Sequence, residues 1–167
     1  MNDSLANIFR FILFLVLQLL LFNNIDFMGY LNPFPYVLYI ILFPVNGNKP
    51  TLLVTSFLLG LFLDMFTNSG GVHATASLFL AYVRPSLFKF SFGLSYEYQT
   101  VKIADKITPE RVSFLILAIF IHHLVLFLLE FFRLSLIVSV IGRTFLATIF
   151  TFFMCLLIIY LIKPNKR

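Results

Sequence analysis

The sequence predicts an all-α integral membrane protein with about six transmembrane helices in a single domain, and three observations lead to this fold class. Of the 167 residues, 60% are hydrophobic and only 11% are charged, whereas a soluble domain is close to half apolar and a quarter charged. Apolar runs of membrane-spanning length recur along the chain between short polar stretches. The third observation is that the basic residues are concentrated on one side of the predicted spans.

The first two runs differ in how readily they cross a bilayer, which takes about 20 apolar residues in a helix. The first is interrupted only by Arg10, Gln18 and an asparagine pair, and Gln18 is expected to bond another helix. The second begins with Pro33 and Pro35 and is too short to cross alone. It either extends back with proline kinks or spans only part of the bilayer packed against its neighbours, and we favour a short, kinked span. The predicted spans cover about 8–25, 33–45, 51–66, 72–90, 112–130 and 144–162, with a polar loop at 91–111 and a connector at 131–142.

The third and fourth spans are joined by the polar turn 67–71, and an acid and a histidine flank it. Asp64 lies near the end of its span, where a charge in a membrane costs less than at the midplane. Gly60, one helical turn earlier, is on the same face and would admit a close neighbour. His73 follows Gly71 and is the expected partner of Asp64, in a charge-assisted contact that locks a helical hairpin. A proton- or ligand-handling site is the alternative interpretation.

Small residues recur along the fourth span at helical spacing. Ala74, Ser77 and Ala81 are three and four residues apart, which places them along one side of a helix. Such seams let membrane helices pack closely. The pattern does not say whether the helix packed there belongs to this chain or to another protein.

The fifth span is expected to start at Thr108-Pro109-Glu110, which reads as an N-cap, a first-turn proline and an early acid. His123 and Glu130 are seven residues apart and share a face of that helix, about 10 Å apart along its axis. We expect hydrogen bonds between helices from His123, and for Glu130 a pairing with Arg133 or Arg143.

The basic residues set the orientation. Six spans place both termini on one side, and that side holds ten of the twelve lysines and arginines; only Arg133 and Arg143 lie on the other. The positive-inside rule therefore predicts that the termini and the 91–111 loop are cytoplasmic. The same residues form no basic stripe with stacking aromatics, so nucleic acid is not an expected partner.

The sequence shows no catalytic constellation, metal site or cofactor motif. It lacks Gly-x-Ser-x-Gly and His-Glu-x-x-His, and the adjacent His122 and His123 point about 100° apart on a helix. The single Cys155 excludes a disulfide within the chain. We therefore predict no enzyme activity. The candidate structural or partner-binding residues are Gln18, Pro33, Gly60, Asp64, Gly71, His73, Ala74, Ser77, Ala81, His123 and Glu130.

Taken in order, several motifs built from these residues make the chain resemble the MreD family, whose members are small multi-span components of the bacterial rod-shape system. The resemblance covers nearly the whole chain in length and span number. One departure is Ser69-Gly70-Gly71 in place of a more usual Gly-Leu-Gly-like turn. The motifs that carry it are Leu17-Gln18, Asn32-Pro33-x-Pro35, Gly60-x-x-x-Asp64, Gly71-x-His73-Ala74 and Ala81-Tyr82.

The resemblance implies a membrane scaffold without enzyme activity. Its partners would be an MreC-like single-span protein, an MreB-like filament, the peptidoglycan polymerase and transpeptidase of cell elongation, and the lipid bilayer. A partner span would then lie on the Ala74-Ser77-Ala81 seam or the Gly60 face. The fold is similar to the substrate-binding S components of energy-coupling-factor vitamin transporters, so such a subunit is the alternative function. An intramembrane enzyme using Asp64 ranks third.

Overall fold

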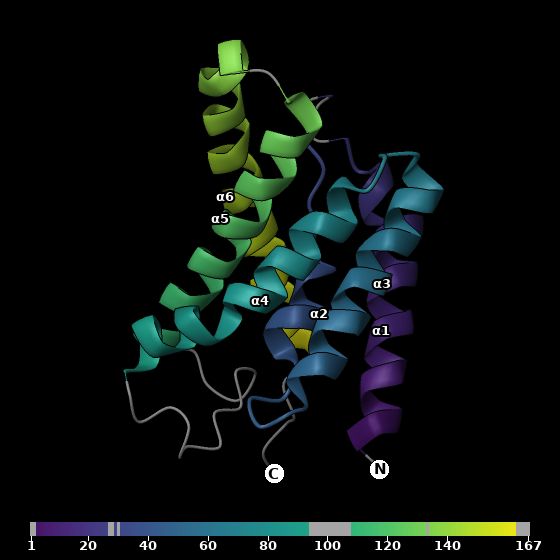
Figure 1. The fold of residues 1–167 in the computed structure, drawn as a ribbon, viewed down its shortest axis with the longest axis vertical. Coiled ribbons are helices and arrows are strands. Elements are labelled where there is room, and N and C mark those ends of the chain that lie inside the picture. Colours follow the sequence, from purple (N-terminus) through teal and green to yellow (C-terminus); the bar gives the residue numbers. More distant parts are fainter. Residues whose placement is uncertain (1–2, 27–28, 30, 94–107, 133, 163–167) are drawn as a thin grey trace.

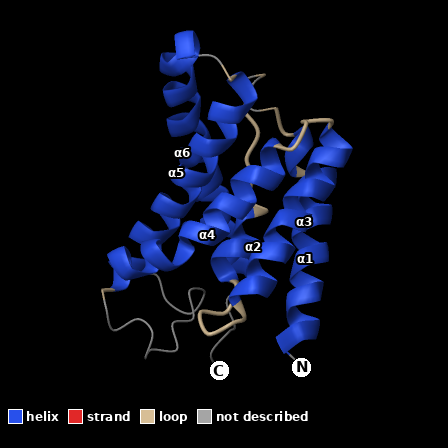
Figure 2. Cartoon of the chain, viewed as in Figure 1, coloured by secondary structure: helices blue, strands red, loops and turns tan. Residues whose placement is uncertain are grey.

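The computed structural model describes residues 3–26, 29, 31–93, 108–132 and 134–162, and within them the fold is all-α (Figures 1 and 2). The predicted loop at 91–111 falls mostly outside these residues. The long helices run between two ends of the molecule, and α1 begins at the end where α6 finishes. The elements are α1 (Asp3–Leu20), η1 (Phe22–Asn24), α2 (Val37–Leu42), α3 (Lys49–Thr67), α4 (Val72–Phe92), α5 (Pro109–Phe131), η3 (Leu134–Leu136) and α6 (Ile137–Ile162).

The long helices follow one another in space as they do in sequence. Helix α3 packs against α4, α4 against α5 and α5 against α6, while α1 lies beside α3 (Figure 1). Short helix α2 contacts α1, α3, α4 and α5, so it lies at the centre of the bundle. Because neighbours in sequence are neighbours in space, the short turns between them decide much of the arrangement.

Several helix ends carry the expected signals. Helix α3 begins after Asn48, whose side chain accepts a hydrogen bond from the Thr51 N–H at 3.4 Å, with Pro50 in the first turn. Helix α5 follows Thr108 and starts at Pro109, where the sequence predicted its start. In contrast, α6 begins at Ile137, so the predicted connector at 131–142 is wrong in its second half. Residues 137–142 are apolar enough to continue the helix through Gly142.

The second predicted span is not a kinked transmembrane helix. Helix α2 has six residues, about 9 Å at 1.5 Å per residue, and an irregular segment, 31–36, leads into it. Prolines 33 and 35 remove two N–H donors and keep that segment from joining the helix. Irregular backbone at membrane depth is tolerated when protein surrounds it, and Tyr36, Val37 and Leu38 are all 0% exposed.

Among the described residues, four helices are long and apolar enough to cross a membrane: α1 extended to Asn24, α3, α5 and α6. This makes the chain a candidate multi-pass membrane protein. Helix α4 has 21 residues but carries Arg84 and Lys89, and it is not among the four. The remaining two crossings of the six-span topology therefore stay a prediction.

The outer helices expose large apolar side chains. On α1, Phe9 and Leu20 are mostly exposed, and on α6 the same is true of Val138 and Phe153. Exposed apolar faces of this length are what a surrounding bilayer would cover. Polar side chains such as Gln18, Asp64 and His123 are, in contrast, buried between the helices.

Candidate functional site

The Asp64 carboxylate lies at the N-terminus of α4. One carboxylate oxygen, Oδ1, accepts hydrogen bonds from the His73 N–H at 3.0 Å and the Ser69 hydroxyl at 2.5 Å. The other, Oδ2, accepts from the Ala74 N–H at 2.8 Å. The first N–H groups of a helix have no partner inside the helix, and they carry its positive dipole end. Asp64 of α3 therefore caps α4, an arrangement we call the Asp64 joint.

The turn before α4 makes this joint geometrically accessible. Asn68 ends α3 in the left-handed region, with φ of 54°, and its N–H bonds the Asp64 carbonyl. Gly70 and Gly71 follow with φ of 70° and 96°, values that side-chain-bearing residues rarely adopt. Three left-handed positions among the four residues 68–71 reverse the chain. The first turn of α4 thereby returns to the carboxylate that caps it.

Gly60 allows the main chains of α3 and α4 to meet. A Cβ atom added at Gly60 would collide with the His73 carbonyl group and lie 2.6 Å from Ala74 Cα. Further along α4, Ser77 is fully buried, and Ala81 lines a cavity together with Leu52 of α3. The small-residue seam is therefore filled by α3 of the same chain. The expectation that a partner helix occupies this seam or the Gly60 face is wrong.

Asp64 contacts His73 as predicted, but through the main-chain N–H of His73 and not through its imidazole. Asp64 bonds the His73 main chain, while His73 Nδ1 lies 2.9 Å from the Tyr36 hydroxyl. The same hydroxyl lies 2.8 Å from His122 Nε2. A hydroxyl donates one hydrogen bond and accepts others, so Tyr36 can serve both rings at once. It thereby joins α4 and α5 through the segment that precedes α2.

Gln18 of α1 binds the same segment from another side. Its Nε2 donates to the Pro33 carbonyl at 3.1 Å and to Asn23 Oδ1 at 2.8 Å. Its Oε1 accepts from the Tyr36 N–H at 3.4 Å. Gln18 is 1% exposed, so both ends of its amide are satisfied in a buried site. The sequence predicted a hydrogen bond from Gln18 to another helix; its partners are instead Asn23 and the irregular segment 31–36.

His123 connects α5 and α6. Its Nδ1 lies 2.7 Å from the Ile119 carbonyl, which can only accept, so this nitrogen carries the hydrogen. Nε2 is then an acceptor for the Thr151 hydroxyl at 3.1 Å, and Thr151 Oγ1 in turn accepts from the Phe34 N–H at 3.1 Å. The irregular segment before α2 is thus held by side chains of α1, α4, α5 and α6. We call these contacts the central network.

Glu130 does not join the central network. It is exposed near the end of α5, and the positive charge of Arg143 acts on its carboxylate, in line with one of its two suggested pairings. The other partner suggested for it, Arg133, is outside the described residues. Within the described part of the chain, no three histidine, cysteine or acidic residues are grouped as metal ligands would be.

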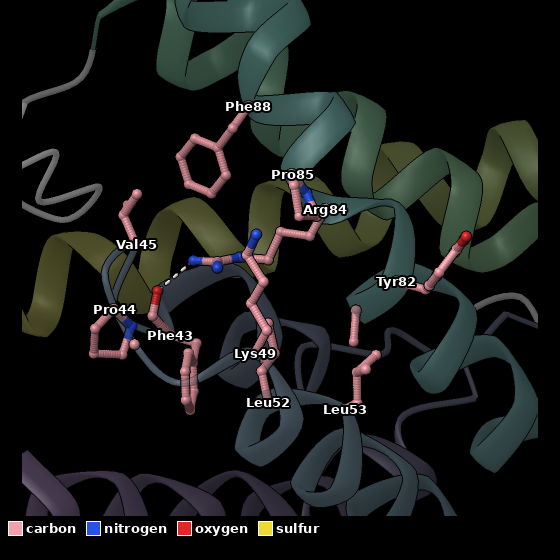
Figure 3. A pocket seen from close by; sticks show the side chains of 12 residues that line it. Phe43, Pro44, Val45, Lys49, Leu52, Leu53, Tyr82, Arg84, Pro85 and Phe88 are labelled. Carbon is pink, nitrogen blue, oxygen red and sulfur yellow. Dashed lines mark hydrogen bonds between the residues drawn. The ribbon is translucent and has the colours of Figure 1, made fainter. Parts of the chain in front are cut away.

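Arg84 is a buried residue that the sequence reasoning counted only as a topology marker. It is 5% exposed, and its Nη2 donates to the Phe43 carbonyl and, at 3.3 Å, to the Ile41 carbonyl (Figure 3). Its guanidinium also lies 4.7 Å from the Phe88 ring centre. These carbonyls end α2 and lack partners inside that helix. An arginine inside an apolar run is itself a signal that could have drawn attention to it.

Comparisons with known protein families, characterised proteins and solved structures give no match to this chain. What the fold and contacts define is a helical protein with the features of a multi-pass membrane protein. The buried side chains of Gln18, Asp64 and Arg84 bind the chain's own helix ends and loops.

Proposed function

We propose that this chain is an MreD-like, non-enzymatic component of the bacterial inner membrane that scaffolds lateral cell-wall synthesis. In this role it binds an MreC-like single-span protein and, with it, an MreB-like filament and the peptidoglycan polymerase and transpeptidase. The ordered motifs of the sequence are the origin of this proposal. The structure adds an independent argument about what those motif residues do.

The observation that supports a scaffold is that the polar motif residues form their hydrogen bonds with groups of this chain. Gln18 binds main-chain groups of 33–36, Asp64 binds the first N–H groups of α4, and the His73 ring contacts the Tyr36 hydroxyl. A catalytic or ligand-binding group needs a polar atom directed at a substrate. These groups are directed at the protein's own backbone and side chains, which favours a structural role for the motif.

The alternative, an S-component-like transporter subunit, needs space for a small molecule inside the bundle. Its centre is filled by the chain itself, since Tyr36, Val37, Leu38 and Ile40 are 0% exposed. A cavity enclosed by α3, α4 and the loop 43–47 measures about 230 Å³, below the roughly 300–1,000 Å³ of typical small-molecule sites. It also lies at the end where α1 begins, opposite to the outward pocket that the alternative requires.

Because α3 already fills the small-residue seam, a partner span has to use an outer face of the bundle. Cysteines placed one at a time on α1 and α6 test this in native membranes, with Ile12, Phe145 and Ile149 as exposed positions. Cys155 is fully buried and can remain as the native residue, since a buried thiol reacts poorly. We expect crosslinks from at least one outer face to a co-purifying single-span protein.

Ser77→Cys provides the control, because position 77 is 0% exposed inside the bundle and should not react with a partner. Failure of any MreC-like protein to co-purify would overturn the proposal. A rise in thermal midpoint on adding a vitamin-sized ligand to the purified protein, without any such partner, would instead support the transporter alternative.

A further inference from the structure

The cavity enclosed by α3, α4 and the loop 43–47 is chemically unlike the rest of the buried interior (Figure 3). It measures about 230 Å³, and its walls are mainly apolar, with Leu53 from α3 and Pro85 from α4 among them. Two cationic side chains reach into it, Lys49 from the start of α3 and Arg84 from the middle of α4. The described residues that line it include no acid, so the lining carries two positive charges and no negative charge.

The local main chain adds to the positive potential. Lys49 is the first residue of α3, and the N-terminus of a helix carries the positive end of its dipole. Asn48 already accepts the Thr51 N–H, so the helix end is ordered around the cavity. Arg84 is also held in place by the Phe43 and Ile41 carbonyls and by the Phe88 ring. A rigid guanidinium and a flexible ammonium therefore face one small space.

The cavity lies where the headgroups of one leaflet would be. It lies at the end where α1 begins and α6 finishes, which the positive-inside rule assigns to the cytoplasm. Tyr82 lines it and is 73% exposed, so its wall continues onto the apolar outer surface of α4. Tyrosine is common at the level where hydrocarbon meets headgroups. An amphiphile can thus enter from the bilayer without crossing the bundle.

We propose that this cavity binds an anionic phospholipid of the cytoplasmic leaflet. The lipid phosphate lies between the Lys49 ammonium and the Arg84 guanidinium, and the start of an acyl chain lies against Leu53 and Tyr82. Basic pockets between membrane helices on the cytoplasmic side bind such headgroups. The volume suits a headgroup with the first atoms of a chain rather than a whole drug-sized molecule. This inference goes beyond the proposed function and does not depend on it.

The test uses the purified full-length chain in a zwitterionic detergent, with thermal midpoint recorded against added lipid. Phosphatidylglycerol is the anionic probe, and phosphatidylcholine is the neutral comparison. Inorganic phosphate tests the charged group of the lipid without the acyl chains. We expect phosphatidylglycerol alone to raise the midpoint in a saturable manner, because a ligand bound only to the folded state stabilises it. Lys49→Gln should weaken its apparent affinity about fivefold, the contribution of one basic residue near an anionic surface.

Lys89→Gln is the matched control, since Lys89 is an exposed lysine of α4 that does not line the cavity. It should leave the apparent affinity unchanged. Leu53→Trp, which fills the cavity without altering charge, should abolish the phosphatidylglycerol response while the lipid-free midpoint reports folding. Equal responses to both lipids, equal losses in Lys49→Gln and Lys89→Gln, or a full response to inorganic phosphate alone would each overturn the proposal.

Discussion

The Asp64 joint at the N-terminus of α4 and the Arg84 site at the middle of the same helix use opposite charges on opposite helix ends. Asp64 places an anion on the N-terminal N–H groups of α4, whereas Arg84 places a cation on the C-terminal carbonyls of α2. Both arrangements complement a helix dipole, and both replace partners that the helix itself cannot supply. The two sites therefore solve the same problem of a helix ending inside a bundle.

The two sites differ in how completely they are closed. The Asp64 carboxylate has three hydrogen bonds from groups within ten residues of it in sequence. Arg84 reaches carbonyls 41 and 43 residues away, and a cavity of about 230 Å³ remains beside it. A closed site made of local contacts serves only the fold. An ordered cation beside an open cavity can also hold a ligand, which is why the inferred lipid is placed there.

The largest effect is expected beside the closed Asp64 joint, from Gly60→Leu. The added side chain meets main-chain atoms of His73 and Ala74, which cannot rotate away. Overpacking usually costs about 1–3 kcal/mol, and against main chain we expect more than about 3 kcal/mol, with no folded peak on size-exclusion chromatography. Gly142→Leu is the control, because nothing lies within 4 Å of its Cβ position. Equal behaviour of the two variants would show that α3 and α4 do not meet at Gly60.

Asp64→Asn should have the next largest effect. The amide replaces one acceptor oxygen with an N–H₂ group that faces a main-chain donor, and the charge on the helix end is lost. Hydrogen bonds to charged groups contribute about 1.5–3 kcal/mol, so we expect a loss of about 3 kcal/mol in unfolding free energy in mixed micelles. The exposed Asp26→Asn should change it by less than about 0.5 kcal/mol. An Asp64→Asn protein as stable as Asp26→Asn contradicts the joint.

Tyr36→Phe tests whether the central network, like the closed Asp64 joint, contributes to the free energy of unfolding. Removing the hydroxyl leaves His73 Nδ1 and His122 Nε2 without the group that they share. A buried polar atom without a partner costs about 1–3 kcal/mol, so we expect a loss of about 2 kcal/mol in the same unfolding measurement. Tyr160→Phe, at an exposed position of α6, serves as the control and should be neutral. A neutral Tyr36→Phe would mean that the network does not hold α4 to α5.

Arg84→Gln should have the smallest effect of the four. A glutamine can still donate to one of the two carbonyls, and the adjacent cavity lets water reach the other. We expect a loss of about 1 kcal/mol, the net value of an ordinary hydrogen bond. Lys89→Gln, an exposed cation on the same helix, controls for the change in charge. A cost at Arg84 equal to that at Asp64 would remove the distinction between an open and a closed site.

The parts of the fold predicted well from sequence are those set by local patterns. The start of α5 at Pro109 followed from turn chemistry, and the Gly-rich turn before α4 from the need for left-handed backbone. The start of α6 was misplaced because an apolar connector and an apolar helix look alike in composition. For the second span, a kinked crossing was favoured over a partial one packed against its neighbours, because a short apolar run next to prolines does not reveal that neighbouring helices enclose it.

The candidate sites divide in the same way. Asp64, Gly60 and Gln18 were predicted as contact residues because a polar or minimal side chain in an apolar helix is conspicuous. Their partners were not predictable, since Asp64 bonds main-chain N–H groups and Gln18 bonds the backbone of 33–36, and backbone groups leave no mark in a sequence. Tyr36 and Thr151 were missed because tyrosine and threonine are unremarkable within membrane helices.

By itself, the sequence determined the all-α class, the apolar helices and the acid and glycines of the α3–α4 turn. These follow from composition, apolar run length and backbone preference, each of which acts over a few residues. Only the tertiary structure decided that α2 lies inside the bundle, that α3 fills the seam on α4, and that Arg84 lies beside a cationic cavity. Those features depend on which distant side chains meet, and packing of the whole bundle settles that.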